Sequence, residues 1–399
     1  MTEIPPPPGS LTPSSRLRIP RIRVLHITAR SDHGGGPEHI RQVIAAETPG
    51  VSHFVACPSN GVYWDRYGEL VGDNKRVAIP HRRVSVPAMI RLTQFIRNNR
   101  IEVIHSHGMG AGVYGRTVAL LTGVPIIHSF HGVPVTPGLK HRLYHLVEHI
   151  MALCTDQGVA VSEGEADLVR RRWGQYRHRL AVVVNGIEPS QVPTWASWPP
   201  KSPLRIVSFT RRNQQKFPEV LIEVARCLRL MGIQFHLDAY GEGLNHPALL
   251  ASVAALDLAR SITFHSAVDD PAIALQGGHV YLSTSRWEGM PLAILEAWHA
   301  GLAVVASNVV GNQDLINAER GFLYPVGNGR AAARIIRDLI ADPVTVNIIR
   351  ANALEVVTRE HSSELMALRL TSMYHQLAHH RDAATSPFLQ MIPETPNNA

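Results

Sequence analysis

One stretch of the sequence, residues 280–306, limits the chain to few fold classes because strand and helix signals alternate in it. A short apolar run ends at Ser283, a polar loop follows, and Pro291 lies where helices favour proline, at the first position. Residues 292–300 then predict a helix that Gly301 ends, and residues 303–306 predict the next buried strand. Strand, loop, helix and strand in this order are typical of a parallel α/β sheet.

Two glutamates mark this unit, Glu288 in the loop before the helix and Glu296 inside the helix. The free N–H groups and the dipole at a helix N-terminus attract anions such as phosphate. A phosphate bound there would lie between two carboxylates that can accept hydrogen bonds from sugar hydroxyls. A solvated helix with two surface glutamates has the same spacing, so the pair alone leaves both interpretations open.

Around these glutamates the sequence runs SRWEGMPLAILEAWHAGLAVVAS, which resembles the donor-site signature of family 4 retaining glycosyltransferases. The resemblance implies that Glu288 contacts the donor sugar and that Glu296 contacts the ribose. Ala303 stands where the family usually has proline, which affects the turn between helix and strand more than the chemistry. The resemblance also assigns three further residues to the donor-site loop: Gly289, Met290 and Leu292.

The same resemblance implies an α/β GT-B fold, in which two Rossmann-like lobes have parallel sheets that face a central cleft. A length of 399 residues suits two such domains. Five prolines between residues 189 and 203 indicate a semi-rigid linker. We therefore expect a disordered leader at 1–20, an acceptor-binding lobe at 21–188, the linker at 189–203, a nucleotide-sugar-binding lobe at 204–380 whose last helix packs back on the first lobe, and a tail at 381–399.

In the first lobe, three glycines separate a predicted strand from a predicted helix: Gly34, Gly35 and Gly36. Glycines at such a turn let backbone N–H groups approach a ligand, although a plain flexible turn would have the same residues. The resemblance implies that they face donor and acceptor. It also implies that His131 contacts the donor sugar or helps to hold the reacting phosphate, and that Asn185 lies at the edge between the domains.

Several histidines lie near His131 in the predicted topology: His26, His33, His105, His107 and His128. His105 and His107 share one face of a predicted strand. No aspartate, glutamate or cysteine joins them at a known metal-ligand spacing. We therefore favour a polar lining of the cleft over a metal site.

A second glycine pattern, at residues 110–115, has the form G-x-G-x-x-G between a predicted strand and a predicted helix. This pattern is typical of dinucleotide-binding turns and would favour an oxidoreductase. An acidic residue should end the next strand to hold a ribose, but that strand is followed by Phe130, His131 and Gly132. We interpret these glycines as positions of close helix packing.

In the second lobe, Arg211 and Lys216 stand in the loop that follows the predicted strand 205–209. The resemblance implies that they neutralise the donor diphosphate, where fixed cations lower the barrier because charge builds up on the leaving group. A solvated basic turn is the alternative. The resemblance further implies that Gly241 and Gly243 approach the nucleotide base, and Asp314 stands where the family often has glutamate.

Charge is spread unevenly along the chain. Residues 1–188 contain 22 Lys and Arg against 14 Asp and Glu, whereas residues 189–399 contain 17 against 18. A basic first half indicates an anionic partner, and because no aromatic-interleaved basic stripe accompanies it we expect no nucleic acid. An amphipathic helix predicted at 140–153 would be an ordinary surface helix or would touch lipid headgroups. Peripheral contact with an anionic membrane through Arg82, Arg83, Arg142 and Arg170–Arg172 is one interpretation of this charge. An arginine excess that serves general solubility, with a soluble acceptor, is the other.

The cellular compartment is indicated by what the chain lacks. No apolar run is long enough to span a membrane, and the N-terminus has no apolar signal-peptide region. Three widely spaced cysteines indicate free thiols in a reducing compartment: Cys57, Cys154 and Cys227. The predicted location is the cytoplasm, including the inner face of the cytoplasmic membrane.

The predicted function is a retaining, metal-independent transfer of a sugar from a nucleotide-diphosphate sugar, by default a UDP-sugar, to a glycan or lipid-linked acceptor in polysaccharide or glycoconjugate biosynthesis. No cofactor is expected, and no metal is needed if Arg211, Lys216 and the helix N-terminus bear the diphosphate charge. The alternative is a catalytically silent GT-B module that binds a sugar nucleotide or scaffolds a biosynthetic complex. Such a module has no chemical reason to keep Glu288, Glu296, Arg211 and Lys216 together.

Overall fold

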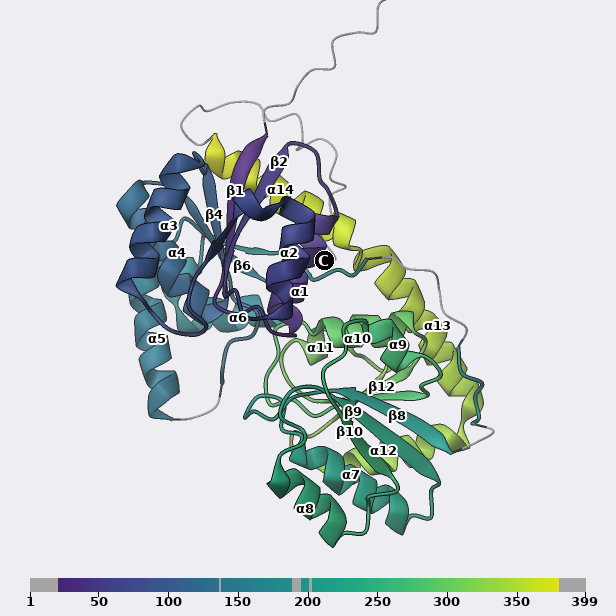
Figure 1. Cartoon of the computed structure of the whole chain (residues 1–399). Coiled ribbons are helices and arrows are strands. Elements are labelled where there is room, and N and C mark those ends of the chain that lie inside the picture. Colours follow the sequence, from purple (N-terminus) through teal and green to yellow (C-terminus); the bar gives the residue numbers. More distant parts are fainter. Residues whose placement is uncertain (1–20, 136–137, 189–194, 201–202, 380–399) are drawn as a thin grey trace, which may run out of the picture.

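The structure, a computed structural model, describes residues 21–135, 138–188, 195–200 and 203–379. The predicted leader, the predicted tail and most of the predicted linker lie outside the described residues. The described chain forms two α/β lobes, each built on one parallel sheet (Figure 1). This arrangement confirms the predicted fold class.

The N-terminal lobe has a sheet of seven parallel strands in the order β3-β2-β1-β4-β5-β6-β7. The order reverses between β1 and β4, and parallel sheets bind ligands beyond the carboxyl ends of strands at such a point. The strands are β1 (Ile22–Thr28), β2 (Val51–Cys57), β3 (Arg76–Ala78), β4 (Val103–His107), β5 (Ile126–Ser129), β6 (Gln157–Ala160) and β7 (Leu180–Val182). The helices are α1 (Gly35–Ala45), α2 (Val62–Val71), α3 (Val86–Asn98), α4 (Gly108–Thr122), α5 (Leu139–Met151) and α6 (Glu163–Arg172), with short 3-10 turns at Asp73–Lys75, Ala152–Cys154 and Gly174–Tyr176.

The C-terminal lobe has a sheet of six parallel strands in the order β10-β9-β8-β11-β12-β13. Its order reverses between β8 and β11, so the loops after these two strands meet at one edge of the sheet. The strands are β8 (Leu204–Phe209), β9 (Phe235–Tyr240), β10 (Ile262–His265), β11 (Val280–Ser283), β12 (Ala303–Ser307) and β13 (Phe322–Tyr324). The helices are α7 (Glu219–Leu230), α8 (Pro247–Ala255), α9 (Pro271–Leu275), α10 (Leu292–His299), α11 (Asn312–Leu315), α12 (Gly329–Ala341) and α13 (Pro343–Glu360).

The last helix, α14 (Ser363–Ala378), crosses back and packs on the N-terminal sheet (Figure 1). Met366, Leu370 and Tyr374 are buried in the same apolar cluster as Ile22 and Val24 of β1. Burial of several large apolar side chains contributes of the order of 1.5–3 kcal/mol each. This packing ties the end of the described chain to the first lobe.

The glycine pattern at 110–115 lies inside α4 and not in a turn before a helix. A Cβ on Gly110 would lie 2.9 Å from the Cβ of Ala29, and a Cβ on Gly115 would lie 2.7 Å from the Cβ of Ser106. Both distances are too short for any side chain, so glycine lets α4 approach β1 and β4. The interpretation as close helix packing is confirmed, and the oxidoreductase reading, which needs a dinucleotide-binding turn, is wrong.

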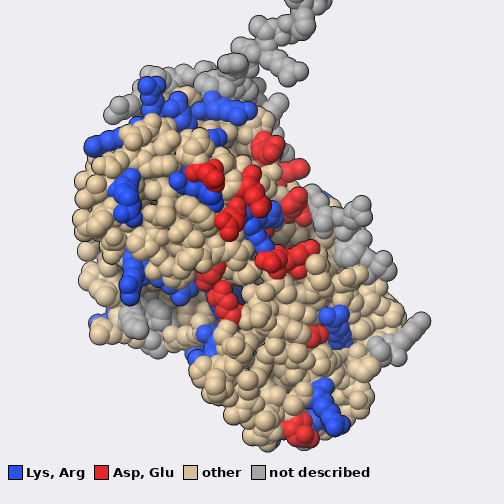
Figure 2. Space-filling view, viewed as in Figure 1, with Lys and Arg blue, Asp and Glu red and all other residues tan. Residues whose placement is uncertain are grey.

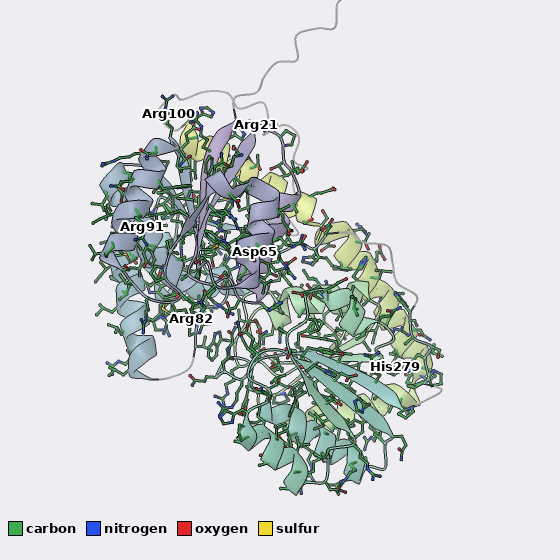
Figure 3. The ribbon with its side chains drawn as sticks, in the orientation of Figure 1. Arg21, Asp65, Arg82, Arg91, Arg100 and His279 are labelled. Carbon is green, nitrogen blue, oxygen red and sulfur yellow. The ribbon has the colours of Figure 1, made fainter. Side chains whose placement is uncertain are left out.

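Basic side chains gather on the N-terminal lobe, and acidic ones gather beside the junction of the two lobes (Figure 2). Arg21 and Arg100 lie at the end of the N-terminal lobe that is far from the C-terminal lobe (Figure 3). On the same lobe, α5 exposes four large apolar side chains: Leu139, Leu143, Leu146 and Ile150. Among the described helices, none combines the length and the apolarity that a membrane crossing requires.

Candidate active site

A cleft of about 510 Å³ lies between the lobes. From the N-terminal lobe it is lined by the start of α1 and by residues of α2, and from the C-terminal lobe by the loops after β8 and β9 and by α10. Seven of the residues predicted for the site line this cleft: Gly34, Gly35, Arg211, Lys216, Gly241, Leu292 and Glu296. The two switch points of the sheets therefore open onto one space.

Lys216 and Glu288 form an ion pair at the cleft. The Nζ atom of Lys216 lies 2.6 Å from Oε1 of Glu288, and the Ser285 hydroxyl donates to the same oxygen at 2.6 Å. The loops that carry them are joined, because the Thr284 hydroxyl donates to the Lys216 carbonyl at 2.7 Å. Glu288 is 8 % exposed, so this ion pair is shielded from water and its two charges interact more strongly than surface charges do.

Arg211 differs from Lys216 because its charge is not neutralised by a neighbour in the described chain. Its Nε and Nη1 atoms are buried and have no hydrogen-bond partner among the described residues. A Cβ built on Gly34 would lie 3.4 Å from Arg211 Nη1, so the glycine at the start of α1 lets the guanidinium approach from the opposite lobe. Buried donors without partners are costly unless a ligand satisfies them, which makes Arg211 a candidate for binding an anion.

Glu296 lies in α10 and faces the cleft. Burial raises the pKa of its carboxyl to about 8, and the negative charges of Glu38 and Asp270 add to this rise. The carboxyl is therefore mostly protonated at pH 7, when it can both donate and accept hydrogen bonds. A neutral acid of this kind suits a ligand that offers hydroxyl groups.

The predicted glycines serve different steric needs. Gly241 has φ of 148°, and a Cβ there would lie 1.6 Å from the Thr210 carbonyl oxygen, so only glycine fits. Gly243 has φ of 74°. Gly35 and Gly36 have no atom within 4 Å of an added Cβ, and Gly36 does not line the cleft. Protein packing therefore does not require a glycine at Gly35. Its missing side chain leaves space in the cleft for a ligand.

The remaining predicted residues meet at the junction of the lobes, next to the cleft. A Cβ on Gly289 would lie 2.8 Å from the backbone nitrogen of Gly132, so the two backbones touch across the junction. Asn185 Nδ2 donates to the carbonyl of Met290 at 2.7 Å, which joins the lobes again. His131 lies before Gly132 and has φ of 58°, a conformation that non-glycine residues seldom adopt.

Asp314 also holds the junction. Its Oδ1 atom accepts the backbone N–H of Gly164 in the N-terminal lobe at 2.8 Å, and its Oδ2 atom accepts that of Gly311 at 3.0 Å. A glutamate would place the carboxylate one methylene further from both donors. The shorter aspartate side chain therefore stabilises the contact between the lobes.

Sequence reasoning missed much of the cleft lining, including a charged and polar group on the N-terminal lobe: Glu38, Arg41, Tyr63 and Arg66. Glu38 accepts hydrogen bonds from Arg41, from Gln42 at 2.7 Å and from the Tyr63 hydroxyl at 2.7 Å. The one signal in the sequence is the position of Glu38, two residues after the glycine turn. Nothing in the sequence pairs it with Tyr63, because that contact depends on how α1 packs on α2.

Comparison with known proteins gives two matching family profiles. Residues 33–191 match the profile described as Glycosyltransferase Family 4, and residues 196–356 match that described as Glycosyl transferases group 1. Together the two profiles span most of both lobes.

Relatives and solved structures agree with these profiles. The chain is 25% identical over 262 residues to a UDP-Gal:alpha-D-GlcNAc-diphosphoundecaprenol alpha-1,3-galactosyltransferase of Escherichia coli, covering 60% of this chain and 67% of that protein. It is 21% identical to the capsular polysaccharide biosynthesis glycosyltransferase CapM of Staphylococcus aureus, covering 72% of this chain and 80% of that protein. The crystal structure of Anabaena HepE in complex with UDP and glucose has a TM-score of 0.75 at 16% identity, covering 89% of this chain and 100% of that chain.

The resemblance read from residues 285–307 is thus confirmed by matches over both lobes. The likeness to HepE concerns the fold alone. Because both halves of the chain match and the cleft lies where the two matched halves meet, the chain belongs to the family 4 (group 1) glycosyltransferases, a retaining family with the GT-B fold.

Proposed function

We propose that this glycosyltransferase takes its sugar from a UDP-sugar and transfers it, with retention, to a lipid-linked or glycan acceptor in polysaccharide or glycoconjugate biosynthesis. The observation that carries the proposal is the pair of cationic side chains, Arg211 and Lys216, that line the cleft. Arg211 has buried N–H groups without a partner among the described residues, and Lys216, which pairs with Glu288, lines the same cleft. This is a site for an anion with several oxygens, such as a diphosphate.

The proposal gives a role to each charged side chain predicted for the site and to His131. Arg211 and Lys216 bind the diphosphate and stabilise the charge that develops on it as the glycosidic bond breaks. Glu296 binds the ribose hydroxyls, and Glu288 binds the donor sugar while it positions Lys216. His131 contacts the donor sugar from the N-terminal lobe. The glycine turn at the start of α1 leaves room where the acceptor meets the donor.

The relatives support the choice of donor and acceptor. The matched Escherichia coli enzyme is named for UDP-Gal as donor and for a diphosphoundecaprenol-linked acceptor, and HepE was solved with UDP-glucose. Both names describe those proteins. For this chain they make a UDP-sugar and a polyprenyl-diphosphate acceptor the first pair to test.

A thermal-shift panel of nucleotide sugars tests the donor. UDP-sugars are expected to stabilise the protein, because a ligand that binds only the folded state adds about 2.7 kcal/mol at a hundredfold excess over Kd. GDP-sugars at the same concentration serve as the control. UDP release is then measured with and without polyprenyl-diphosphate acceptors. Stabilisation by GDP-sugars alone would disprove the donor, and binding without any turnover would indicate a catalytically silent module.

We further propose that the N-terminal lobe contacts an anionic membrane at the inner face of the cytoplasmic membrane. The helix α5, which exposes four large apolar side chains, belongs to the lobe that has an excess of basic residues. A basic residue near an anionic surface contributes about 1 kcal/mol, which salt screens. Apolar side chains on one helix add a contact with the acyl chains that salt does not weaken.

Sedimentation with vesicles tests this contact. The protein is expected to sediment with anionic vesicles at low salt and less with neutral ones. The double variant Leu143→Gln/Leu146→Gln should bind several-fold more weakly, because these side chains are 59% and 57% exposed on α5. Leu250→Gln, at an exposed leucine of the C-terminal lobe, is the matched control. Sedimentation with neither kind of vesicle at any salt would contradict the proposal.

A further inference from the structure

Buried histidines are concentrated at the carboxyl end of the N-terminal sheet, beside the cleft. Two groups of three place ring nitrogens within 4.8 Å of one another. The first group is His26, His105 and His107, and the second is His39, His107 and His131. Imidazole nitrogens are ligands for transition metals, so each group has to be judged by what its nitrogens already bind.

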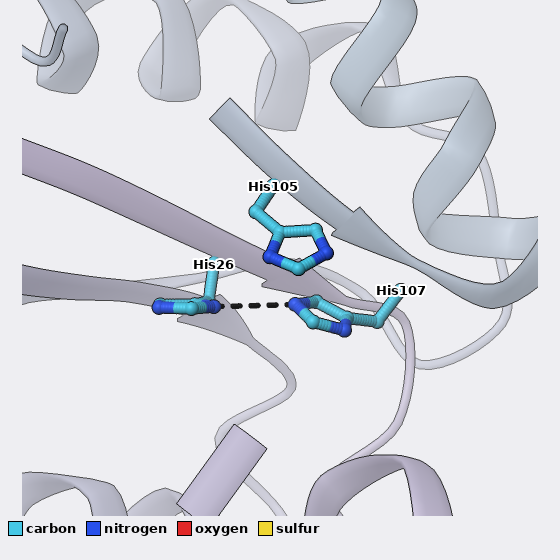
Figure 4. Close-up of side chains that lie close together, drawn as sticks. All are labelled: His26, His105 and His107. Atoms are coloured by element: carbon cyan, nitrogen blue, oxygen red, sulfur yellow. Dashed lines mark hydrogen bonds between the residues drawn. The ribbon is translucent and has the colours of Figure 1, made fainter. Parts of the chain in front are cut away.

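Figure 4 shows the three rings of the first group and the hydrogen bond between His26 and His107. Every ring nitrogen of this group already has a hydrogen-bond partner. His105 contacts the Tyr374 hydroxyl through Nδ1 at 2.7 Å and the Ser129 hydroxyl through Nε2 at 2.8 Å. His26 contacts His53 through Nε2 at 2.9 Å and His107 through Nδ1 at 3.2 Å. A metal here would have to break an existing hydrogen bond, so this group is a hydrogen-bonded part of the core.

The second group has a nitrogen without a partner. His39 is 1% exposed, and its Nε2 atom has no hydrogen-bond partner among the described residues. Its Nδ1 atom lies 2.9 Å from Oδ1 of Asn185. The Asn185 amide nitrogen donates to the Met290 carbonyl, which fixes Oδ1 as the acceptor toward His39. His39 therefore carries its proton on Nδ1, and Nε2 offers a buried lone pair.

The other two histidines of the group have a separation that suits a shared ion. His107 Nδ1 and His131 Nε2 lie 3.1 Å apart. Two nitrogens at about 2.0–2.1 Å from a tetrahedral zinc ion lie roughly 3.3 Å apart, close to this value. A metal can replace the hydrogen bond between them if each ring carries its proton on the other nitrogen.

For His107 an acceptor for that proton is already in place. Its Nε2 atom lies 3.2 Å from Nδ1 of His26, whose Nε2 atom lies 2.9 Å from Nδ1 of His53. Each ring in this row can donate to the next, which leaves Nδ1 of His107 as a lone pair and places the last proton on the buried Nε2 atom of His53, which has no partner among the described residues. Metal-binding histidines almost always donate their second N–H in this way, and His39 does so to Asn185.

The protonation of the group also suits a metal. Burial lowers the pKa of His39 to about 4 and holds the pKa values of His107 and His131 well below the usual range. All three rings are therefore neutral at pH 7, the form that binds metals, and no proton has to be displaced from a charged ring. Ligands that are all imidazole favour zinc, copper or nickel over magnesium or calcium.

We propose that His39, His107 and His131 form a binding site for a divalent transition-metal cation of the zinc class, with its open coordination position beside His131. His131 is half-buried, whereas His39 and His107 are buried, so an ion or a water ligand would enter from the side of His131. Bound metal takes up Nε2 of His131. If His131 contacts the donor sugar, as proposed above, metal and donor then compete; the metal site itself does not depend on that role.

Titration of the metal-stripped protein with Zn²⁺ and with Co²⁺ tests the site. Wild type is expected to bind one ion tightly, to give the visible absorption of tetrahedral Co²⁺, and to show a raised Tm with Zn²⁺. His39→Gln should bind about 100-fold more weakly or worse, because losing even a residue that supports a ligand costs 10–100-fold. His178→Gln, at an exposed histidine outside the group, is the control for weak surface binding and should match wild type.

Circular dichroism without metal checks the fold of each variant. If His39→Gln does not fold, His131→Gln decides, because His131 is less buried. Equal affinity in wild type and the folded variant, or a Co²⁺ spectrum of octahedral type, would overturn the proposal. Metal binding is read without donor or acceptor, so this result is independent of the transfer assay.

Discussion

Replacing Lys216 with alanine is expected to lower kcat/KM for sugar transfer by about 100-fold or more, as the loss of one preorganised charge stabiliser does. The side chain lies 2.6 Å from Glu288 in a shielded pair, so the variant also leaves that carboxylate without its cation. Arg211→Ala is expected to act alike, because it removes the buried N–H groups that lack a partner in the described chain. Both variants are measured by UDP release at saturating acceptor.

Arg212→Ala is the matched control for these two variants. Arg212 is an exposed arginine in the same loop and does not line the cleft, so its removal changes the net charge without touching the site. Its rate should stay close to that of wild type. Circular dichroism confirms that each variant is folded. If Arg211→Ala and Lys216→Ala kept the rate of Arg212→Ala, neither residue would bind the diphosphate.

The parallel unit around α10 could be predicted because its signals are local. The predicted helix at 292–300 ends one residue beyond the observed α10, and the predicted strand at 303–306 lies within β12. Proline before the helix and glycine after it mark the ends wherever the chain folds. The positions of Glu288 and Glu296 relative to the helix therefore followed from the sequence.

The opposite wall of the cleft could not be predicted, because its contacts depend on packing between distant segments. Glu38 and Tyr63 are 25 residues apart and meet only after α1 packs on α2. His26 lies opposite His105 because of the register between β1 and β4, and a shift of one residue would turn one ring to the other face. Neither strand register nor helix packing can be predicted from a local sequence pattern.

The glycine pattern at 110–115 shows how a local signal misleads. Glycine is needed there because α4 lies against β1 and β4, as the contacts of Gly110 and Gly115 demonstrate. Glycines at the same spacing in a turn before a helix would let the backbone bind the pyrophosphate of a dinucleotide. The sequence pattern is the same for both uses, and they differ in whether the helix begins before the glycines, as α4 does at Gly108. In the sequence, only the absence of an acidic residue after the next strand favoured helix packing.

The two glutamates are expected to separate binding from transfer. Glu296→Ala should weaken UDP binding about 10- to 100-fold, because the neutral carboxyl would lose two hydrogen bonds to the ribose that are worth about 0.5–1.5 kcal/mol each. Glu288→Ala should leave UDP affinity nearly unchanged and lower transfer by about 100-fold or more, because its partner is the sugar and its charge positions Lys216. Calorimetry with UDP and UDP release from the UDP-sugar measure the two effects.

The protonation of Glu296 makes the test sharper. Since burial raises its pKa to about 8, the wild-type carboxyl is mostly neutral at pH 7, and glutamine is then a close substitute. Glu296→Gln should therefore keep UDP affinity within about threefold of wild type at pH 7, whereas Glu288→Gln should still lose transfer because it cannot pair with Lys216. If the alanine variants of both residues lost UDP equally, or if Glu296→Gln bound UDP as weakly as Glu296→Ala, this division of roles would be wrong.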